Sequence, residues 1–194
     1  MLPFGQSVQQ TQTTRVKALK VSSDVVAKHL ETCGFSRDIA GPDDFYKAVR
    51  AVCAMFEHGR GLFLTGAAGC GKTQLMRAVQ RWLNPNTLNW VYVKEPADIE
   101  YMRSRDDDIL KTNVYVDDIG CEEIIREYGN VVDVVGDFTQ RYHYRGAGRF
   151  FATTNLNSEE INQRYGTRML DRILEMCVVM KFDGKTKRER VVIK

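Results

Sequence analysis

The sequence contains no long hydrophobic run. No stretch of its 194 residues approaches the ~18 consecutive apolar residues that a membrane-spanning helix needs. The amino-terminal residues MLPFGQSVQQTQTT lack the charged start and the apolar middle of a secretory signal. We therefore expect a protein that has no membrane segment and works in the cytoplasm.

Cysteine is present but forms no recognisable framework. The five cysteines are dispersed, with no C-x-x-C pair: Cys33, Cys53, Cys70, Cys121 and Cys177. An odd, scattered set argues against a disulfide frame and a zinc site, and is typical of reduced thiols in a cytoplasm. The formal net charge of +3 is only mildly basic, so it permits anionic partners without indicating them.

The first 40 residues offer little that could form a core by itself. Residues 1–20 are polar and basic and contain a Gln/Thr-rich stretch, which favours a flexible arm. A short helix is expected over 22–35, before a boundary at DIAGPDD. We therefore divide the chain into an arm with a short helix, residues 1–40, and a folded domain, residues 41–194.

The folded domain begins with a helix, expected from about Pro42 to Gly59, and then alternates strands with helices. The predicted strands are GLFLT (61–65), WVYV (90–93), NVYVDD (113–118), RFFATT (149–154) and CVVMKF (177–182). The helices between them are predicted at 71–83, near 96–104, around 130–142, and at 158–165 and 167–176. Near-continuous apolar strands that alternate with helices predict an α/β fold, in which a parallel sheet is covered by helices on both faces.

The segment GAAGCGKT matches the phosphate-loop pattern G-x-x-x-x-G-K-[ST] and lies between a predicted strand and a predicted helix. Its glycines let the backbone turn so that N–H groups point at phosphate oxygens, and the helix start adds a partial positive charge. Lys72 is expected to reach the β- and γ-phosphates of ATP, and Thr73 to ligate Mg²⁺. The residues expected to bind the nucleotide are Gly66, Ala67, Ala68, Gly69, Cys70, Gly71, Lys72, Thr73 and Gln74.

The apolar segment VYVDDIG ends in two carboxylates. We interpret Asp117 as a residue of the Mg²⁺ shell and Asp118 as the residue that orients or deprotonates the attacking water. The alternative is a strand that ends in a solvated acidic turn. Many ATPases carry Glu at the second position, and Asp is one methylene shorter, so the sequence indicates nucleotide binding more strongly than fast hydrolysis.

A polar residue also follows the fourth predicted strand. Asn155 lies at the tip of RFFATTNLN, where the carboxyl ends of parallel strands face the ligand. We predict that it polarises the attacking water or contacts the γ-phosphate, with Thr153, Thr154 and Asn157 as competitors. The alternative is that Asn155 caps the following helix, but Asn157 suits that cap better.

Two arginines lie four residues apart in YGTRMLDRILEM. Arg168 and Arg172 therefore share one helical face. Beside Asp171 and Glu175 they are typical of a solvated, salt-bridged face. The alternative is an arginine finger that enters the nucleotide site of a neighbouring subunit, an arrangement that builds rings or filaments.

These motifs together resemble the AAA+ ATPases, and within them the DnaC/DnaI-type helicase loaders and the related IstB transposition ATPases. The resemblance covers about residues 42–190 and rests on GAAGCGKT, VYVDDIG, TTN, YGTRMLDRI and the closing KFDGKTKR. The last of these is similar to the F-x-G-x-S-x-R ending of the loader group, through Phe182, Gly184, Thr186 and Arg188.

The resemblance implies a P-loop NTPase of the AAA+ type, with a five-stranded parallel sheet in the order 5-1-4-3-2. It implies Asn155 as a sensor residue and an arginine finger at Arg172, with Arg168 as the second choice. Arg188 becomes a candidate second sensor arginine. The sequence also departs from the family, because the usual helical lid and the DNA-binding helical insertion are expected to be absent or reduced and residues 1–40 carry no zinc-type cysteine cluster.

The evidence for nucleic-acid binding is local. RYHYR (141–145) interleaves basic and aromatic side chains, which suits phosphate contact and base stacking. Arg149, the tail 184–194 and Arg15, Lys17 and Lys20 of the arm are also basic. Such segments are commonly basic for solubility alone, so DNA contact stays an open alternative.

The resemblance implies an ATPase with ATP and Mg²⁺ as cofactors that acts in DNA replication, beside a replicative helicase and on single-stranded DNA, and that assembles with itself through the arginine finger. One alternative is an IstB-like transposition helper on duplex DNA. Another is a nucleotide-dependent adaptor that binds ATP but barely hydrolyses it.

Overall fold

The structure is a computed structural model that describes residues 18–83, 88–92, 106–122, 125–127 and 130–184. The helix expected near 96–104, Thr186 and Arg188, and the basic residues Arg15 and Lys17 lie outside these ranges. The same holds for the segment in which a lid would begin.

The centre of the fold is a sheet of five strands, in which all neighbouring strands run parallel. The strands are β1 (Gly61–Thr65), β2 (Leu88–Tyr92), β3 (Asn113–Ile119), β6 (Phe150–Thr154) and β7 (Cys177–Lys181). Their order across the sheet is β2-β3-β6-β1-β7. Numbered along the chain, these five strands read 5-1-4-3-2 from β7 to β2, so their carboxyl ends all meet at one edge.

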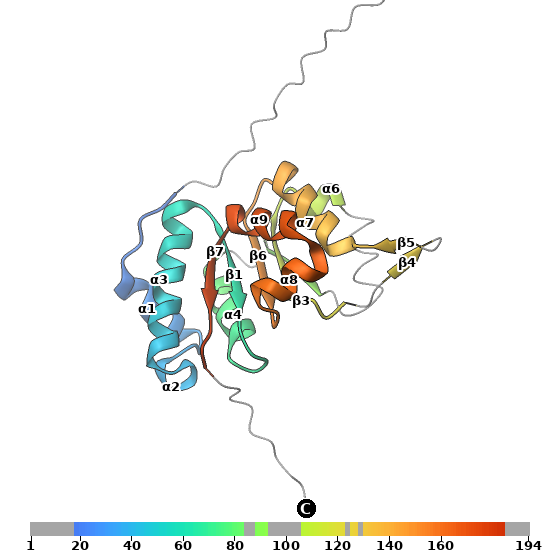
Figure 1. The fold of residues 1–194 in the computed structure, drawn as a ribbon. Coiled ribbons are helices and arrows are strands. Elements are labelled where there is room, and N and C mark those ends of the chain that lie inside the picture. Colours follow the sequence, from blue (N-terminus) through green and yellow to red (C-terminus); the bar gives the residue numbers. More distant parts are fainter. Residues whose placement is uncertain (1–17, 84–87, 93–105, 123–124, 128–129, 185–194) are drawn as a thin grey trace, which may run out of the picture.

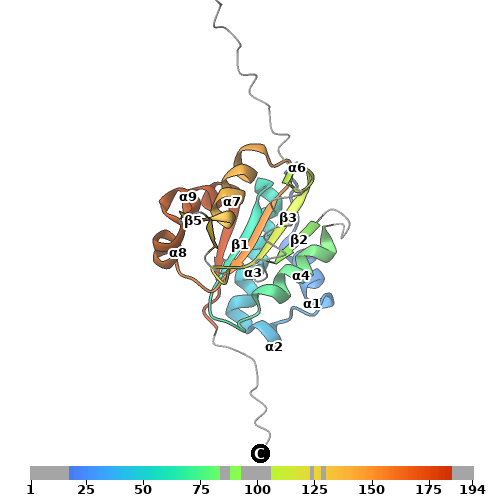
Figure 2. The same ribbon diagram turned by 90° about the vertical axis from the view of Figure 1, so that its right-hand side faces the viewer.

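Helices cover both faces of this sheet (Figures 1 and 2). One face carries α1 (Ser23–Thr32), α3 (Pro42–His58) and α4 (Lys72–Trp82), and the other carries α7 (Val134–Arg145), α8 (Ser158–Tyr165) and α9 (Thr167–Met176). The buried side chains accordingly form two hydrophobic clusters, one on each side of the sheet. The predicted α/β architecture is therefore confirmed.

The amino-terminal helices belong to this packed unit. Val26 and Leu30 of α1, and Phe35 before α2 (Arg37–Ala40), are fully buried in the same cluster as α3 and α4. The short helix was predicted correctly. Its buried side chains lie in the same hydrophobic core as those of residues after 41. The reason is that α1 presents an apolar side to α3 and α4 that has no other place to be buried.

Two short strands were not predicted from the sequence. β4 (Ile125–Glu127) and β5 (Asn130–Val132) form an antiparallel pair, where the sequence placed the start of a helix at 130. That helix, α7, begins only at Val134, because the Asp133 side chain accepts a hydrogen bond from the Gly136 N–H at 2.8 Å and caps it. A one-turn helix, α6 (Asp106–Ile109), precedes β3.

Candidate nucleotide-binding site

The phosphate loop lies between β1 and α4, as predicted. Gly66 and Gly71 take φ angles of +143° and +109°, which glycine adopts far more readily than other residues. A Cβ on Gly66 would come within 2.9 Å of Phe182, so the segment after β7 packs directly against the loop. The loop therefore depends on glycine both for its turn and for the close approach of Phe182.

Lys72 is the charged residue at the centre of this loop. Its side chain is buried, and its ammonium group donates hydrogen bonds to the carbonyl oxygens of Gly66 at 2.7 Å and Ala67 at 3.0 Å. It also donates to Asn155 Oδ1 at 2.8 Å. Within the described residues no carboxylate pairs with Lys72, so its positive charge is held by neutral oxygens, which a phosphate group could replace.

Asn155 thus lies beside Lys72, although 83 positions separate the two in the sequence. The competing residue Asn157 caps α8 instead. Its side chain accepts hydrogen bonds from the N–H groups of Glu159 and Glu160, and the Glu160 side chain closes the capping box. Asn157 is therefore the helix cap that the sequence favoured, while the role of Asn155 beside Lys72 stays a prediction.

Asp117 is buried near the carboxyl end of β3 and accepts hydrogen bonds from two side chains. The hydroxyl groups of Tyr115 and Thr153 both donate to its Oδ1, each at 2.6 Å. The Tyr115 phenol also interacts with the Thr73 side chain, so it contacts both predicted Mg²⁺ ligands, Thr73 and Asp117. This arrangement suits a cation that is shared between a helix start and a strand tip.

Tyr115 is a member of the site that the sequence reasoning missed. The signal was a tyrosine two positions before Asp117, hence on the same face of the strand. Its ring is fully buried. Burial, reinforced by the Asp117 carboxylate, raises the pKa of Tyr115 well above its ordinary value, so the phenol stays protonated and donates to Asp117.

Asp118 lies in an unusual backbone conformation. Its φ is +56°, and the pairing of β3 with β6 shifts register between Val116 and Ile119. The Asp118 N–H donates to Thr153 Oγ1 at 2.9 Å, and the residue is half-buried. A bulge of this kind re-aims side chains at a strand end, and a strained conformation outside glycine is typical of functional positions.

The two threonines that competed with Asn155 brace the site. Thr153 contacts both acidic residues of β3, as described above, and Thr154 Oγ1 donates to the Ile119 carbonyl at 2.6 Å. Thr154 also accepts the Leu156 N–H at 3.0 Å. Both threonines are fully buried and have partners within the protein, so neither points freely at a ligand.

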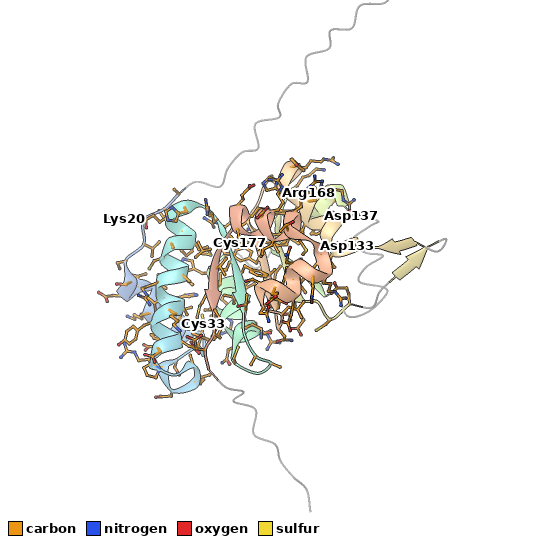
Figure 3. The ribbon with its side chains drawn as sticks, viewed as in Figure 1. Lys20, Cys33, Asp133, Asp137, Arg168 and Cys177 are labelled. Atoms are coloured by element: carbon orange, nitrogen blue, oxygen red, sulfur yellow. The ribbon has the colours of Figure 1, made fainter. Side chains whose placement is uncertain are left out.

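The two arginines of α9 differ in their surroundings. Arg172 donates to the Glu175 carboxylate at 3.0 Å and to the Tyr144 hydroxyl at 3.1 Å, and its guanidinium lies over the Tyr144 ring. Arg168 is exposed, and within the described residues it has no ion pair or hydrogen bond. It lies on the α7–α9 side of the sheet (Figure 3). Arg168 is thus available to another subunit, whereas Arg172 would first have to leave its partners.

Two other predicted nucleotide contacts have tasks inside the protein. The Gln74 amide donates to the Gly34 carbonyl and ties α4 to the end of α1. Cys70 is fully buried, with its sulfur 3.9 Å from Lys72 Nζ. Ala67, Ala68 and Gly69 form the outer part of the loop.

Two further properties concern the described residues. They contain no group of three or more His, Cys, Asp or Glu side chains that could hold a metal ion by itself. Nucleotide-bound Mg²⁺ needs only one or two protein ligands besides phosphate oxygens, which matches Thr73 and Asp117. In the same ranges no helix has both the length and the apolar character needed to cross a bilayer.

Solved structures provide the comparison with known proteins. No protein-family model and no curated protein matches the chain. DnaI is 23% identical, with a TM-score of 0.52 over 78% of this chain and 93% of its own. The DnaC helicase loader is 19% identical, with a TM-score of 0.46 over 64% of this chain and 78% of its own. AMPPCP-bound DnaA from Aquifex aeolicus is 14% identical, with a TM-score of 0.41 over 63% of this chain and 40% of its own.

The likeness to DnaI concerns the fold. Both chains share an α/β fold, which in this protein is a parallel sheet with helices on both faces. Identity this low says nothing by itself about partners or activity. The chemistry of the site must therefore carry the functional argument.

Proposed function

We propose that the protein binds ATP with Mg²⁺ and hydrolyses it. The observation that supports this most is the meeting of Lys72 and Asn155 at 2.8 Å, because two polar residues from different motifs converge at the mouth of the loop. Thr73 and Asp117 supply oxygen ligands next to it. Mg²⁺, when bound there, would neutralise charge on the β- and γ-phosphates.

The residues of the chain have separate tasks in this proposal. Lys72 exchanges its carbonyl partners for phosphate oxygens, while the glycine-rich loop offers backbone N–H groups. Asp118 orients the attacking water and accepts its proton, and Asn155 contacts that water or the γ-phosphate. Tyr115 and Thr153 fix the Asp117 carboxylate, so that it needs no rearrangement when the nucleotide arrives.

We further propose a role in DNA replication as a helicase-loader-like factor. The motif order and the fold shared with DnaI support this reading. Its expected partners are a replicative helicase and single-stranded DNA, with a neighbouring copy completing each nucleotide site through Arg172 or Arg168. This arrangement would let ATP order the subunits and hydrolysis release them.

A second candidate is an adaptor that binds ATP and barely hydrolyses it. The observation in its favour is Asp118, whose short carboxylate sits on a strained backbone at φ +56°. A carboxylate that cannot reach the attacking water would leave binding intact and slow the chemical step. No such observation favours the IstB-like transposition helper. It would differ from the loader in its preference for duplex DNA.

Steady-state ATP turnover distinguishes these readings. Stimulation by single-stranded DNA supports the loader, stimulation by duplex supports the transposition helper, and negligible turnover with intact ATP binding supports the adaptor. The matched variants Asn155→Ala and Asn157→Ala sharpen the result. We expect Asn155→Ala to lower turnover about 100-fold or more with ATP affinity kept.

Asn157→Ala should remove about 1 kcal/mol of stability through the lost cap, with turnover kept. Equal turnover in the two variants would remove Asn155 from the mechanism. If the wild-type protein does not bind ATP, the whole proposal is wrong.

A further inference from the structure

The structure contains a second polar cavity, at the edge of the sheet opposite the phosphate loop. It has a volume of about 550 Å³ and lies where α3, α7 and α9 end and where β1 and β6 begin. The phosphate loop follows β1 at its other end, so the two sites lie at opposite edges of the same sheet (Figure 1). The cavity is therefore no part of the nucleotide site.

Arg149, a buried cation, lines this cavity, and within the described residues no anion pairs with it. Arg149 is only 7% exposed, and its Nε has no hydrogen-bond partner. The contact found for its guanidinium is the Phe56 ring, 5.3 Å from Cζ. A ring face attracts a cation weakly and does not replace a counter-ion. Burial lowers the pKa of Arg149, and in the part of the chain that the structure describes no carboxylate offsets this effect.

The Arg149 backbone is hydrogen-bonded at both its N–H and its carbonyl, so the point from which the side chain starts is fixed. Its N–H donates to Asn113 Oδ1 at 2.8 Å, and its carbonyl accepts from the Val114 N–H at 3.0 Å. The Tyr142 hydroxyl donates to the same carbonyl at 3.2 Å. Holding an unpaired cation this firmly costs stability, which an anionic ligand would recover.

The rest of the lining also favours an anion. Arg60 is exposed at the cavity and adds a second positive charge to its lining. Glu175 is the one carboxylate of the lining, and its charge is already engaged by Arg172 and His143. The exposed ring of Tyr144 stands at the same cavity and could stack on a planar group.

We propose that this cavity binds a phosphate group, with Arg149 as the buried anchor and Arg60 at the entrance. A guanidinium presents a planar set of donors that matches phosphate oxygens. The volume exceeds that of one phosphate ion, which suits a phosphate carried by a larger molecule. That phosphate belongs either to a nucleic-acid strand or to a small organic phosphate, and the site is independent of ATP binding.

Thermal unfolding in inorganic phosphate, compared with sodium chloride at equal ionic strength, tests the site. The variants are Arg149→Met, which keeps an apolar stem against Phe56, and Arg60→Ser, which changes only an exposed side chain. The control is Arg77→Met, an exposed arginine of α4 outside the cavity. The phosphate loop contributes equally to all four proteins, so differences between them report on the cavity.

We expect phosphate to raise the midpoint of the wild type and of Arg77→Met by several degrees, about 3 °C at ten times the dissociation constant. Arg149→Met and Arg60→Ser should lose most of this extra rise. An equal rise in all four proteins would overturn the proposal. Because Arg60 is exposed, its variant stays informative if Arg149→Met fails to fold.

Fluorescence anisotropy with a labelled single-stranded oligonucleotide then identifies the source of the phosphate. Weaker oligonucleotide binding in both cavity variants, but not in Arg77→Met, supports a nucleic-acid strand. Unchanged oligonucleotide binding, with the phosphate effect intact, supports a small organic phosphate. The site is contradicted if phosphate does not raise the unfolding midpoint of the wild type, or if the rise does not depend on Arg149 and Arg60.

Discussion

Tyr115 shows at the scale of one residue how the nucleotide site is held ready. Its hydroxyl donates to Asp117 and also interacts with Thr73, the two residues proposed to hold Mg²⁺. Without this donor, Asp117 would keep only Thr153 as a side-chain partner on the same oxygen. The carboxylate would then have more freedom to turn away from the metal.

Tyr115→Phe should therefore raise the Mg²⁺ concentration needed for half-maximal nucleotide binding. A hydrogen bond to a charged group contributes about 1.5–3 kcal/mol, so a shift of roughly tenfold is expected. Tyr142→Phe is the matched control, because that buried hydroxyl bonds to the Thr112 and Arg149 carbonyls instead. A magnesium titration that gives the same midpoint in both variants would contradict this role.

The sequence named several residues that the structure places around the phosphate loop, and their roles in nucleotide binding stay predictions. Lys72, Thr73, Asp117 and Asn155 were predicted because each ends a strand or begins a helix within a motif. Tyr115 was missed because an aromatic ring within an apolar strand is expected to be an ordinary core side chain. The bulge at Asp118 depends on the register with β6, which no local pattern reveals.

At the scale of elements, the start of α3 clasps the segment that follows β7. The buried Asp44 carboxylate accepts the N–H groups of Asp183 at 3.2 Å and Gly184 at 3.0 Å. Just before this clasp, Phe182 is buried against Gly66 and donates its N–H to the Thr65 carbonyl at 2.8 Å. Asp44 thus supports the back of the phosphate loop from a distance.

Asp44→Ala should lower the free energy of unfolding by about 2 kcal/mol, because it leaves two N–H groups without their acceptor. Asp43→Ala is the control, since Asp43 occupies the same first turn of α3 and is exposed. Any interaction with the helix dipole is then similar in both variants. Denaturant unfolding that gives equal losses would show that the clasp adds nothing.

The elements themselves were largely predictable, because apolar strands and amphipathic helices are punctuated by glycine and capping residues. β1, α8 and α9 have the predicted bounds. The β4–β5 pair was missed because strands of three residues are too short to show a period. The packing of α1 onto the core was underestimated, because its apolar side is narrow.

At the scale of the whole molecule, we propose that one copy completes the nucleotide site of the next. Arg168 and Arg172 share a face of α9, but Arg172 is held by Glu175 and Tyr144 while Arg168 is exposed. The sequence could place both on one helical face. It could not show that Tyr144, 28 positions earlier, would engage Arg172.

Mixing two inactive variants tests whether an arginine acts in a neighbouring subunit. Lys72→Ala keeps both arginines but lacks a working phosphate loop. Arg168→Ala and Arg172→Ala each keep the phosphate loop but lack one arginine. For the arginine that acts across the interface, we expect each variant alone to be inactive and the mixture to regain ATP turnover. Failure to regain turnover with Arg168→Ala and with Arg172→Ala would contradict completion of the site in trans.

The most direct test of the central claim is calorimetric titration with a non-hydrolysable ATP analogue in Mg²⁺. The account predicts binding to the wild type and to Lys28→Ala, an exposed lysine of α1. It predicts at least about a 100-fold weaker affinity in Lys72→Ala, because the buried charge that meets the phosphates is lost. Equal affinity in Lys72→Ala and the wild type would contradict it.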